Sequence, residues 1–282
     1  MKLIGPFTQI LTMRNLPMKG TIKDEQLELI ENGGIIVENG FIRQVGNYKQ
    51  LREQNPAIEL EEINTEQVVL PGFVDSHTHI CYGGNRAKDF AMRLNGKTYL
   101  EIAESGGGIW STVTQTRSKS PDELKDITLH HIDKLIAQGI TTAEVKSGYA
   151  LSVEGEKNML QAIGMAKQET PIEVVTTFLG AHMKPKDFEG SNRDYLEHLV
   201  QEIFPVLRKE YQCNRVDIFV EQSAFSIEEG DYYMNEAKKQ GFELTIHADQ
   251  FTAGASQLAV KYQALSADHL EFSGKDEIMA LS

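Results

Sequence analysis

Pro-Gly-Phe-Val-Asp-Ser-His-Thr-His (residues 71–79) is the most informative stretch of this sequence. The Pro-Gly pair predicts a turn, and the alternation from Phe73 to His79 predicts a strand in which residues two apart share one face. Two imidazoles on one face of a strand are suitable ligands for a divalent metal ion. The alternative is a strand with two surface histidines, but the turn, the apolar strand and the in-register Asp75 favour His77 and His79 as metal ligands.

The composition is that of a globular protein. The chain has 282 residues, of which 40% are hydrophobic and 24% charged, which suits one large domain or one large and one small domain. No apolar run approaches the ~20 residues of a membrane span, and the first residues lack the pattern of a signal peptide. With two cysteines, a reducing cytoplasm is the expected location. The net charge of −13 argues against nucleic-acid or membrane partners, and an anionic substrate would need local cations.

Two regions with different patterns are expected. Residues 1–69 predict a small β domain, because apolar segments at 34–37 and 41–45 flank Asn39-Gly40, a pair typical of tight hairpins. From residue 70 onward, predicted strands alternate with helices; these strands cover residues 140–145, 172–179, 216–220, 242–246 and 264–267. Capping boxes predict helix starts at Ser120 and Ser226, Pro205 should bend or split a long helix, and Ser273 is expected to cap the last helix.

The alternation of strands and helices fits either a closed (β/α)8 TIM-like barrel or an open doubly wound sheet. Polar residues at strand carboxyl ends separate the two folds, and they are His77, His79, Tyr149, His182, Glu221, His247, Asp268 and His269. Convergence from many strands favours a barrel mouth, whereas an open sheet would concentrate such residues at one switch point. About six barrel strands are recognisable, so residues 70–282 are expected to form an incomplete barrel. Its bare edges would invite association, and a homodimer is allowed.

The candidate site is built from several strand ends. His247 ends a strand and would complete a three-histidine set, an arrangement of catalytic zinc sites; the alternative is a satisfied core histidine. His269, preceded by Asp268, is a candidate proton shuttle or partner of a ligand. His182 could donate a hydrogen bond to a substrate oxygen. Arg86 offers a forked clamp for a carboxylate, with an ordinary surface arginine as the alternative.

Three further features have more than one possible role or a supporting one. Asp75 is expected to orient a ligand rather than bind the metal. Glu221 either lines the mouth of the barrel or pairs with a lysine or arginine. The glycines at 106–108 either cradle an anion or form a flexible linker before a helix.

Taken together, the motifs resemble the metal-dependent amidohydrolase superfamily, and within it the enzymes of histidine breakdown that open an imidazolone ring. The motifs are Pro-Gly-Phe-Val-Asp-Ser-His-Thr-His (71–79), Glu-Ser-Gly-Gly-Gly-Ile (104–109), Glu-Val-Lys-Ser-Gly-Tyr (144–149), Thr-Phe-Leu-Gly-Ala-His (177–182), His-Ala-Asp-Gln (247–250) and Ser-Ala-Asp-His-Leu-Glu (266–271). The resemblance implies a (β/α)8 barrel and a small β-sandwich built from both chain ends, with residues 1–69 as its N-terminal part. It also implies one zinc or iron ion held by His77, His79 and His247.

The resemblance further implies a small anionic substrate, 4-imidazolone-5-propanoate, which is hydrolysed to N-formimidoyl-L-glutamate. Arg86, Tyr149, His182 and Gln250 would contact this substrate. His269 would sit beside the activated water, and together with His182 and Gln250 it makes up the candidate catalytic set.

One departure from the family pattern is expected to matter. In the family an aspartate from the eighth strand supplies a fourth metal ligand, and nothing in this sequence matches it. The chain therefore reads as a truncated product, expected to be inactive or barely active beside a longer form. The rival interpretations are another cyclic amidase or aminohydrolase of the same superfamily, and a non-catalytic scaffold that has lost its metal.

Overall fold

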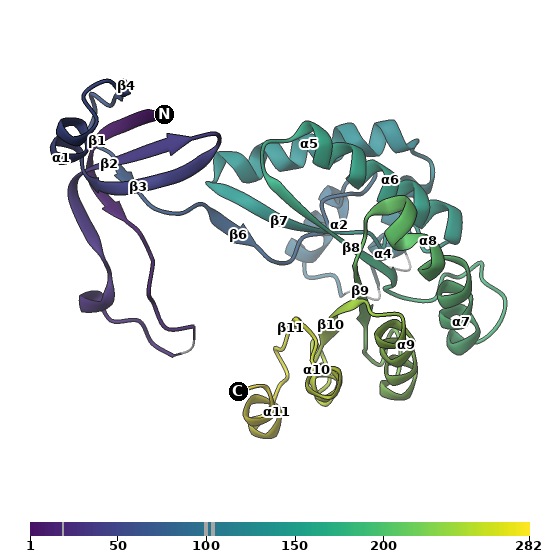
Figure 1. Ribbon diagram of the computed structural model, residues 1–282. Coiled ribbons are helices and arrows are strands. Elements are labelled where there is room, and N and C mark those ends of the chain that lie inside the picture. Colours follow the sequence, from purple (N-terminus) through teal and green to yellow (C-terminus); the bar gives the residue numbers. More distant parts are fainter. Residues whose placement is uncertain (19, 99–100, 103–104) are drawn as a thin grey trace. The chain divides into compact units, whose positions relative to one another are not determined.

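A computed structural model describes residues 1–18, 20–98, 101–102 and 105–282 of the chain (Figure 1). Glu104, the first residue of the glycine-rich motif, lies outside this description. The chain divides into two compact units, Met1–Gly72 and Phe73–Ser282, and each is described by itself. In the described part of the chain, no helix combines the length and the apolar composition that a bilayer crossing requires.

The first unit is a five-stranded sheet in the order β3-β2-β1-β4, with β5 also beside β1. Its elements are β1 (Lys2–Leu11), the 3-10 turn η1 (Asp24–Gln26), β2 (Leu29–Glu38), β3 (Phe41–Asn47), α1 (Tyr48–Gln54), β4 (Glu59–Glu62) and β5 (Val68–Val69). β1, β2 and β3 are antiparallel, whereas β4 and β5 run parallel to β1.

The predicted hairpin of the first unit is confirmed. Glu38 pairs with Phe41 across the turn, and the two turn residues, Asn39 and Gly40, have φ angles of 51° and 80°. Positive φ at both central positions is the requirement of a type I′ turn, whose twist matches that of the flanking strands. The small core of this unit is built from Leu3, Ile36, Tyr48 and Leu51.

The second unit contains a six-stranded parallel sheet whose strands follow one another in chain order. The strands are β6 (Phe73–Asp75), β7 (Ile140–Lys146), β8 (Glu173–Ala181), β9 (Arg215–Phe219), β10 (Glu243–Ala248) and β11 (Ser266–His269). A doubly wound sheet would reverse this order at a switch point. The sheet is curled, and this architecture is that of a TIM-like barrel, which confirms the expected fold class.

Helices follow most of the strands, and α5 to α10 cover the outside of the curled sheet (Figure 1). They are α2 (Ala87–Leu94), α4 (Gly108–Arg117), α5 (Pro121–Ala137), α6 (Val153–Glu169), α7 (Asn192–Glu202), α8 (Phe204–Tyr211), α9 (Ile227–Lys239), α10 (Ser256–Tyr262) and α11 (Lys275–Leu281). The predicted capping boxes at Ser120 and Ser226 are present. Pro205 lies in the first turn of α8, where it separates that helix from α7 as expected.

The cap of the last helix differs from the prediction. Gly274, not Ser273, is the N-cap of α11. The Ser273 hydroxyl instead donates a hydrogen bond of 2.7 Å to a carboxylate oxygen of Asp249. The Ser273 side chain therefore binds Asp249, which is distant in the sequence, instead of capping the helix as the sequence pattern predicted.

Alternation along the barrel strands separates an apolar outer face from a polar inner face. In β9, Val216 and Ile218 join the hydrophobic core under the helices, whereas Asp217 between them binds polar residues of other strands. In β10, the same core takes Leu244 and Ile246. Because successive side chains of a strand point to opposite faces, this pattern directs charged groups into the curl of the sheet.

Candidate metal centre

The stretch that holds the first two histidines is only partly a strand. β6 ends at Asp75, so the expectation that the strand continues to His79 is wrong. Thr78 is turned toward β7, where its carbonyl accepts from the Lys146 backbone at 3.0 Å and its hydroxyl donates to the Glu144 carbonyl at 2.5 Å. This attachment holds the segment of His77 and His79 as irregular backbone against β7.

The Asp75 side chain binds the backbone of this segment. Its carboxylate accepts from the backbone N–H of His77 at 3.3 Å, rather than from an imidazole. Asp75 thus stabilises the turn of the chain immediately after β6.

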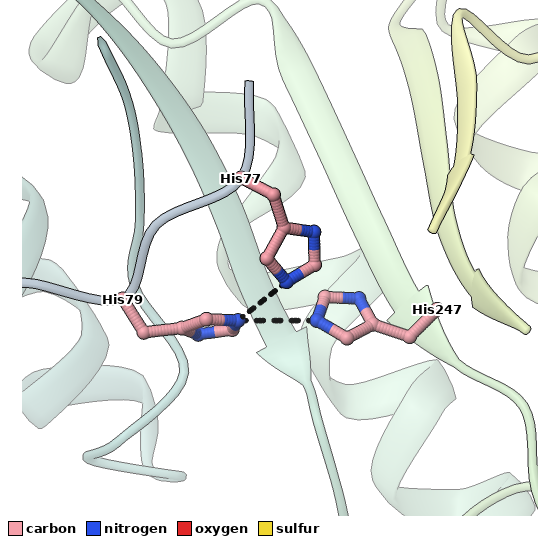
Figure 2. Close-up of side chains that lie close together, drawn as sticks. All are labelled: His77, His79 and His247. Carbon is pink, nitrogen blue, oxygen red and sulfur yellow. Dashed lines mark hydrogen bonds between the residues drawn. The ribbon is translucent and has the colours of Figure 1, made fainter. Parts of the chain in front are cut away.

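Three imidazoles converge on one point (Figure 2). The Nε2 atom of His79 lies 3.1 Å from Nε2 of His77 and 3.1 Å from Nε2 of His247, which comes from β10. His247 is buried, and the other two histidines are partly buried. The structure therefore brings together the three residues that the sequence analysis selected as metal ligands.

Carboxylates hold the far side of two of these rings. Nδ1 of His247 lies 3.0 Å from Oδ1 of Asp217, and Nδ1 of His77 lies 2.8 Å from Oδ2 of Asp268. Asp217 accepts the hydrogen bond of His247, so it places the imidazole proton on Nδ1 and leaves Nε2 with a free lone pair. Asp268 lies beside Nδ1 of His77 as a close negative charge. Carboxylate–histidine pairs of this kind orient metal-binding imidazoles.

The donor set fits a metal ion. Lone pairs on neighbouring Nε2 atoms repel one another unless a cation lies between them, and tetrahedral coordination at 2.0–2.1 Å would separate the nitrogens by about 3.3 Å. The Nδ1 atom of His79 is buried without a hydrogen-bond partner in the described part of the chain. Burial, followed by the charges of His182, His247 and His77, lowers the pKa of His79 well below its usual value, which keeps the ring in the neutral form that metals bind.

His182 and Tyr149 flank the imidazole cluster. Their ring centroids lie 5.5 Å and 5.7 Å from that of His79, and 5.4 Å from each other. Nδ1 of His182 donates to the carbonyl of Gly148 at 3.0 Å. Burial and the charge of His247 lower the pKa of His182 to about 3, so the ring is neutral. Its Nε2 is then an acceptor, which argues against the expected donor role.

His269 is the last residue of β11 and lies beside the imidazole cluster. Its ring centroid is 5.3 Å from that of His77 and 5.1 Å from that of His247. Its side chain keeps 26% of its surface accessible. Its φ angle is 77°, a left-handed conformation that non-glycine residues rarely adopt and that concentrates at functional sites.

Arg86 and Gln250 are not part of the imidazole cluster. The Arg86 side chain donates from Nε to Thr112 Oγ1 at 2.7 Å and from Nη1 to Asp89 Oδ2 at 3.1 Å.

Gln250 is half-buried and follows Asp249, which has a φ of 51°. The loop beyond Gln250 is held by Glu221, whose carboxylate accepts from the backbone of Phe251 at 2.8 Å. Glu221 thus anchors a loop, and no lysine or arginine among the described residues forms an ion pair with it.

Sequence reasoning missed the buried charges beneath the site. Lys146 is completely buried and lies against carboxylates of Glu144, Asp217 and Asp268. Asp217 is a charged residue between Val216 and Ile218 in a buried strand, and this interruption is a signal that the sequence offered. Since Lys146 lies on β7 and Asp217 on β9, their contact crosses the interior of the curled sheet past β8.

Another buried carboxylate, that of Glu156, supports the loop of Tyr149. Glu156 of α6 accepts hydrogen bonds from the backbone N–H groups of Gly148, Ala150 and Leu151, each at 2.9 Å. Burial raises the pKa of Glu156. These bonds fix the loop whose Gly148 carbonyl in turn fixes the ring of His182.

Comparison with known proteins identifies the family of this architecture. The profile of the amidohydrolase family matches residues 68–280. Imidazolonepropionase of Bdellovibrio bacteriovorus is 41% identical over 273 residues, which cover 95% of this chain and 64% of that protein. Imidazolonepropionase of Clostridium tetani is 34% identical over 277 residues, covering 98% of this chain and 66% of that protein. The chain thus spans slightly less than two thirds of the length of these curated relatives.

Solved structures show the same fold at low sequence identity. Guanine deaminase from C. acetobutylicum superposes with a TM-score of 0.63 at 15% identity, over 99% of this chain and 65% of that one. Ochratoxinase from A. niger gives a TM-score of 0.59 at 13% identity, over 99% of this chain and 62% of that one. The matched profile covers the barrel unit up to residue 280, including its three converging histidines, and the chain therefore belongs to the amidohydrolase family.

Proposed function

We propose that this chain carries out the hydrolytic ring opening of 4-imidazolone-5-propanoate to N-formimidoyl-L-glutamate in histidine degradation. The observation that carries the proposal is the convergence of the three Nε2 atoms of His77, His79 and His247. The relatives named imidazolonepropionase, at 34% and 41% identity, support this substrate over other cyclic amides. The chemistry belongs to the barrel, residues 70–282, and the cytoplasm is the proposed location.

The proposed cofactor is one zinc or iron ion held by the three imidazoles. Such an ion, when bound, supplies Lewis acidity toward the ring carbonyl and activates water. Asp217 supports it by keeping the Nδ1 proton of His247 in place, so that the Nε2 atom presents a lone pair. Asp268 places a negative charge beside Nδ1 of His77.

Proton movement is proposed for His269. Its ring lies beside those of two ligands and its side chain is partly accessible, so it can exchange protons with solvent. Hydrolysis removes a proton from water and delivers one to the leaving ring nitrogen, and one imidazole can do both in turn. Burial and the charge of His247 lower the pKa of His269, which favours the neutral, proton-accepting form.

Substrate orientation is proposed for His182, Tyr149 and Gln250. With its Nδ1 proton given to Gly148, neutral His182 offers an Nε2 acceptor, which suits an N–H group of the imidazolone ring. The rings of His182 and Tyr149 form a wall beside His79 against which a flat heterocycle could lie. Gln250 would add an amide that can donate and accept.

Arg86 is the proposed partner of the propanoate tail. Its Nε and Nη1 atoms already bind Thr112 and Asp89. A carboxylate would therefore use the remaining N–H groups, which are one on Nη1 and two on Nη2. Asp89 is also fixed by the backbone N–H of Gly108 at 2.8 Å. Sharing the guanidinium between two carboxylates would orient Arg86 toward the substrate.

The test is an assay of ring opening, in which the loss of substrate absorbance is monitored after zinc or ferrous iron is added to the metal-free chain. The Bdellovibrio relative serves as positive control. We expect a turnover far below that of the longer Bdellovibrio relative, which depends on the added metal and disappears in His247→Asn. His130→Asn, which alters an exposed histidine of α5, should retain it. Equal turnover in the parent and His247→Asn would refute the proposal, whatever the absolute rate.

A further inference from the structure

The buried lysine beneath the imidazoles has more acidic neighbours than it can neutralise. Nζ of Lys146 lies 2.7 Å from Glu144 Oε2, 2.6 Å from Asp217 Oδ2 and 3.6 Å from Asp268 Oδ2. The lysine side chain has no accessible surface. Buried charges persist only where they are paired and hydrogen-bonded, so this ammonium is the main compensation for the acids that surround it.

Two of these carboxylates also contact imidazoles of the candidate metal centre. Asp217 bridges Lys146 and the Nδ1 atom of His247. Asp268 lies between Lys146 and the Nδ1 atom of His77. One ammonium thus fixes the carboxylates that orient two of the three imidazoles.

The same residues have the spacing of a second cation site. One ligand atom each from Asp217, His247 and Asp268 lie within 4.8 Å of one another, a separation over which a single ion could bind all three. Nζ of Lys146 is in contact with the carboxylates of two of these three residues. The Lys146 ammonium, which belongs to a side chain of β7, therefore already lies where a second metal ion would be placed.

We propose that the ammonium of Lys146 takes the place of a second metal ion, so that this site binds one ion at its three imidazoles. The inference rests on the proposed function, because it assumes the ion at His77, His79 and His247. It makes Lys146 a positioning residue, which acts through Asp217 and Asp268 without touching the substrate.

The electrostatics of the site support a permanent ammonium. Burial alone would lower the pKa of Lys146, but the charges of Asp217 and Glu144 outweigh burial and raise it. Thr245 donates a further hydrogen bond of 2.7 Å to Asp217, which fixes the carboxylate that Lys146 binds.

The test counts metal ions in charge-matched variants. The Lys146→Met/Glu144→Gln double variant removes one ammonium and one carboxylate charge, so it keeps the net charge of the parent together with Asp217 and Asp268. Glu144→Gln alone is its matched control, and Lys146→Arg retains the cation. Each metal-free protein is titrated with cobalt(II), followed by visible absorption and by elemental analysis after gel filtration, and folding is monitored by circular dichroism.

We expect one cobalt ion per chain in the parent, in Glu144→Gln and in Lys146→Arg, and two in the double variant. One ion in a folded double variant would overturn the inference and leave the proposed function standing. Should the double variant not fold, Lys146→Arg decides, since one ion there supports the inference and two contradict it. No ion in the parent would instead overturn the proposed function, and the inference with it.

Discussion

Replacing Asp217 by asparagine tests how much the carboxylate behind His247 contributes to metal binding. The change keeps the shape of the side chain but removes the charge that faces His247 and Lys146. Loss of such an outer partner typically weakens metal affinity 10–100-fold, which corresponds to about 1.4–2.8 kcal/mol. We expect the zinc dissociation constant of Asp217→Asn to rise within this range.

The same substitution should also destabilise the metal-free chain. Removal of one member of a buried ion pair typically costs about 3–5 kcal/mol. Lys146 keeps Glu144 at 2.7 Å, so we expect a loss near the lower end, about 3 kcal/mol. A domain with a stability of about 5–15 kcal/mol would remain folded, and the zinc measurement would remain possible.

The assay is zinc competition with a chelator at neutral pH, together with urea unfolding of the metal-free proteins. Asp231→Asn is the matched control, because Asp231 pairs with Lys261 and Tyr262 at the surface, where such pairs contribute at most about 1 kcal/mol. A zinc dissociation constant of Asp217→Asn within about twofold of the parent would refute the reasoning.

Three further predictions concern groups outside the imidazoles. Burial raises the pKa values of the Cys81 and Cys213 thiols to about 12, so neither should react with a thiol reagent at pH 8 until the chain unfolds; rapid labelling of the folded chain would contradict their burial. Ser120→Ala removes the cap of α5 and should cost about 1 kcal/mol in urea unfolding, whereas no change would show that the cap is dispensable. Thr78→Val leaves the buried Glu144 carbonyl without its 2.5 Å hydrogen bond and should cost about 1–3 kcal/mol while weakening zinc binding; unchanged zinc affinity would show that this bond does not position the histidines.

Local signals in the sequence predicted much of the fold. The capping boxes at Ser120 and Ser226, the split at Pro205 and the Asn39-Gly40 hairpin all depend on residues within a few positions of one another. Such interactions are encoded by spacing alone. The order of the barrel strands followed from the alternation of strands and helices, because consecutive parallel strands are usually neighbours.

Features that depend on distant partners were not predictable in the same way. The strand at residues 73–79 is shorter than its alternation suggested, because Thr78 binds β7, about 66 residues further along the chain. Ser273 was assigned to a helix cap but binds Asp249. In both cases a tertiary hydrogen bond replaced the local one that the pattern favoured.

The convergence of His77, His79 and His247 was predictable from the sequence, but the contacts that support these histidines were not. Histidines at strand carboxyl ends are readable from sequence, since those ends meet at one edge of a barrel. The role of Lys146 depends on which residues of β9 and β11 face it across the interior, and no spacing in the sequence reports this. Arg86 and Asp89 are only three residues apart, so their pairing could have been expected from helical geometry.

The central claim is that three imidazoles of this chain bind a single metal ion. X-ray absorption spectroscopy of the zinc-loaded chain tests it most directly. The account predicts three histidine nitrogens at about 2.0–2.1 Å from zinc in the parent, with the loss of one in His247→Asn. Zinc coordinated by fewer than three imidazoles in the parent, or a coordination shell unchanged in His247→Asn, would contradict it.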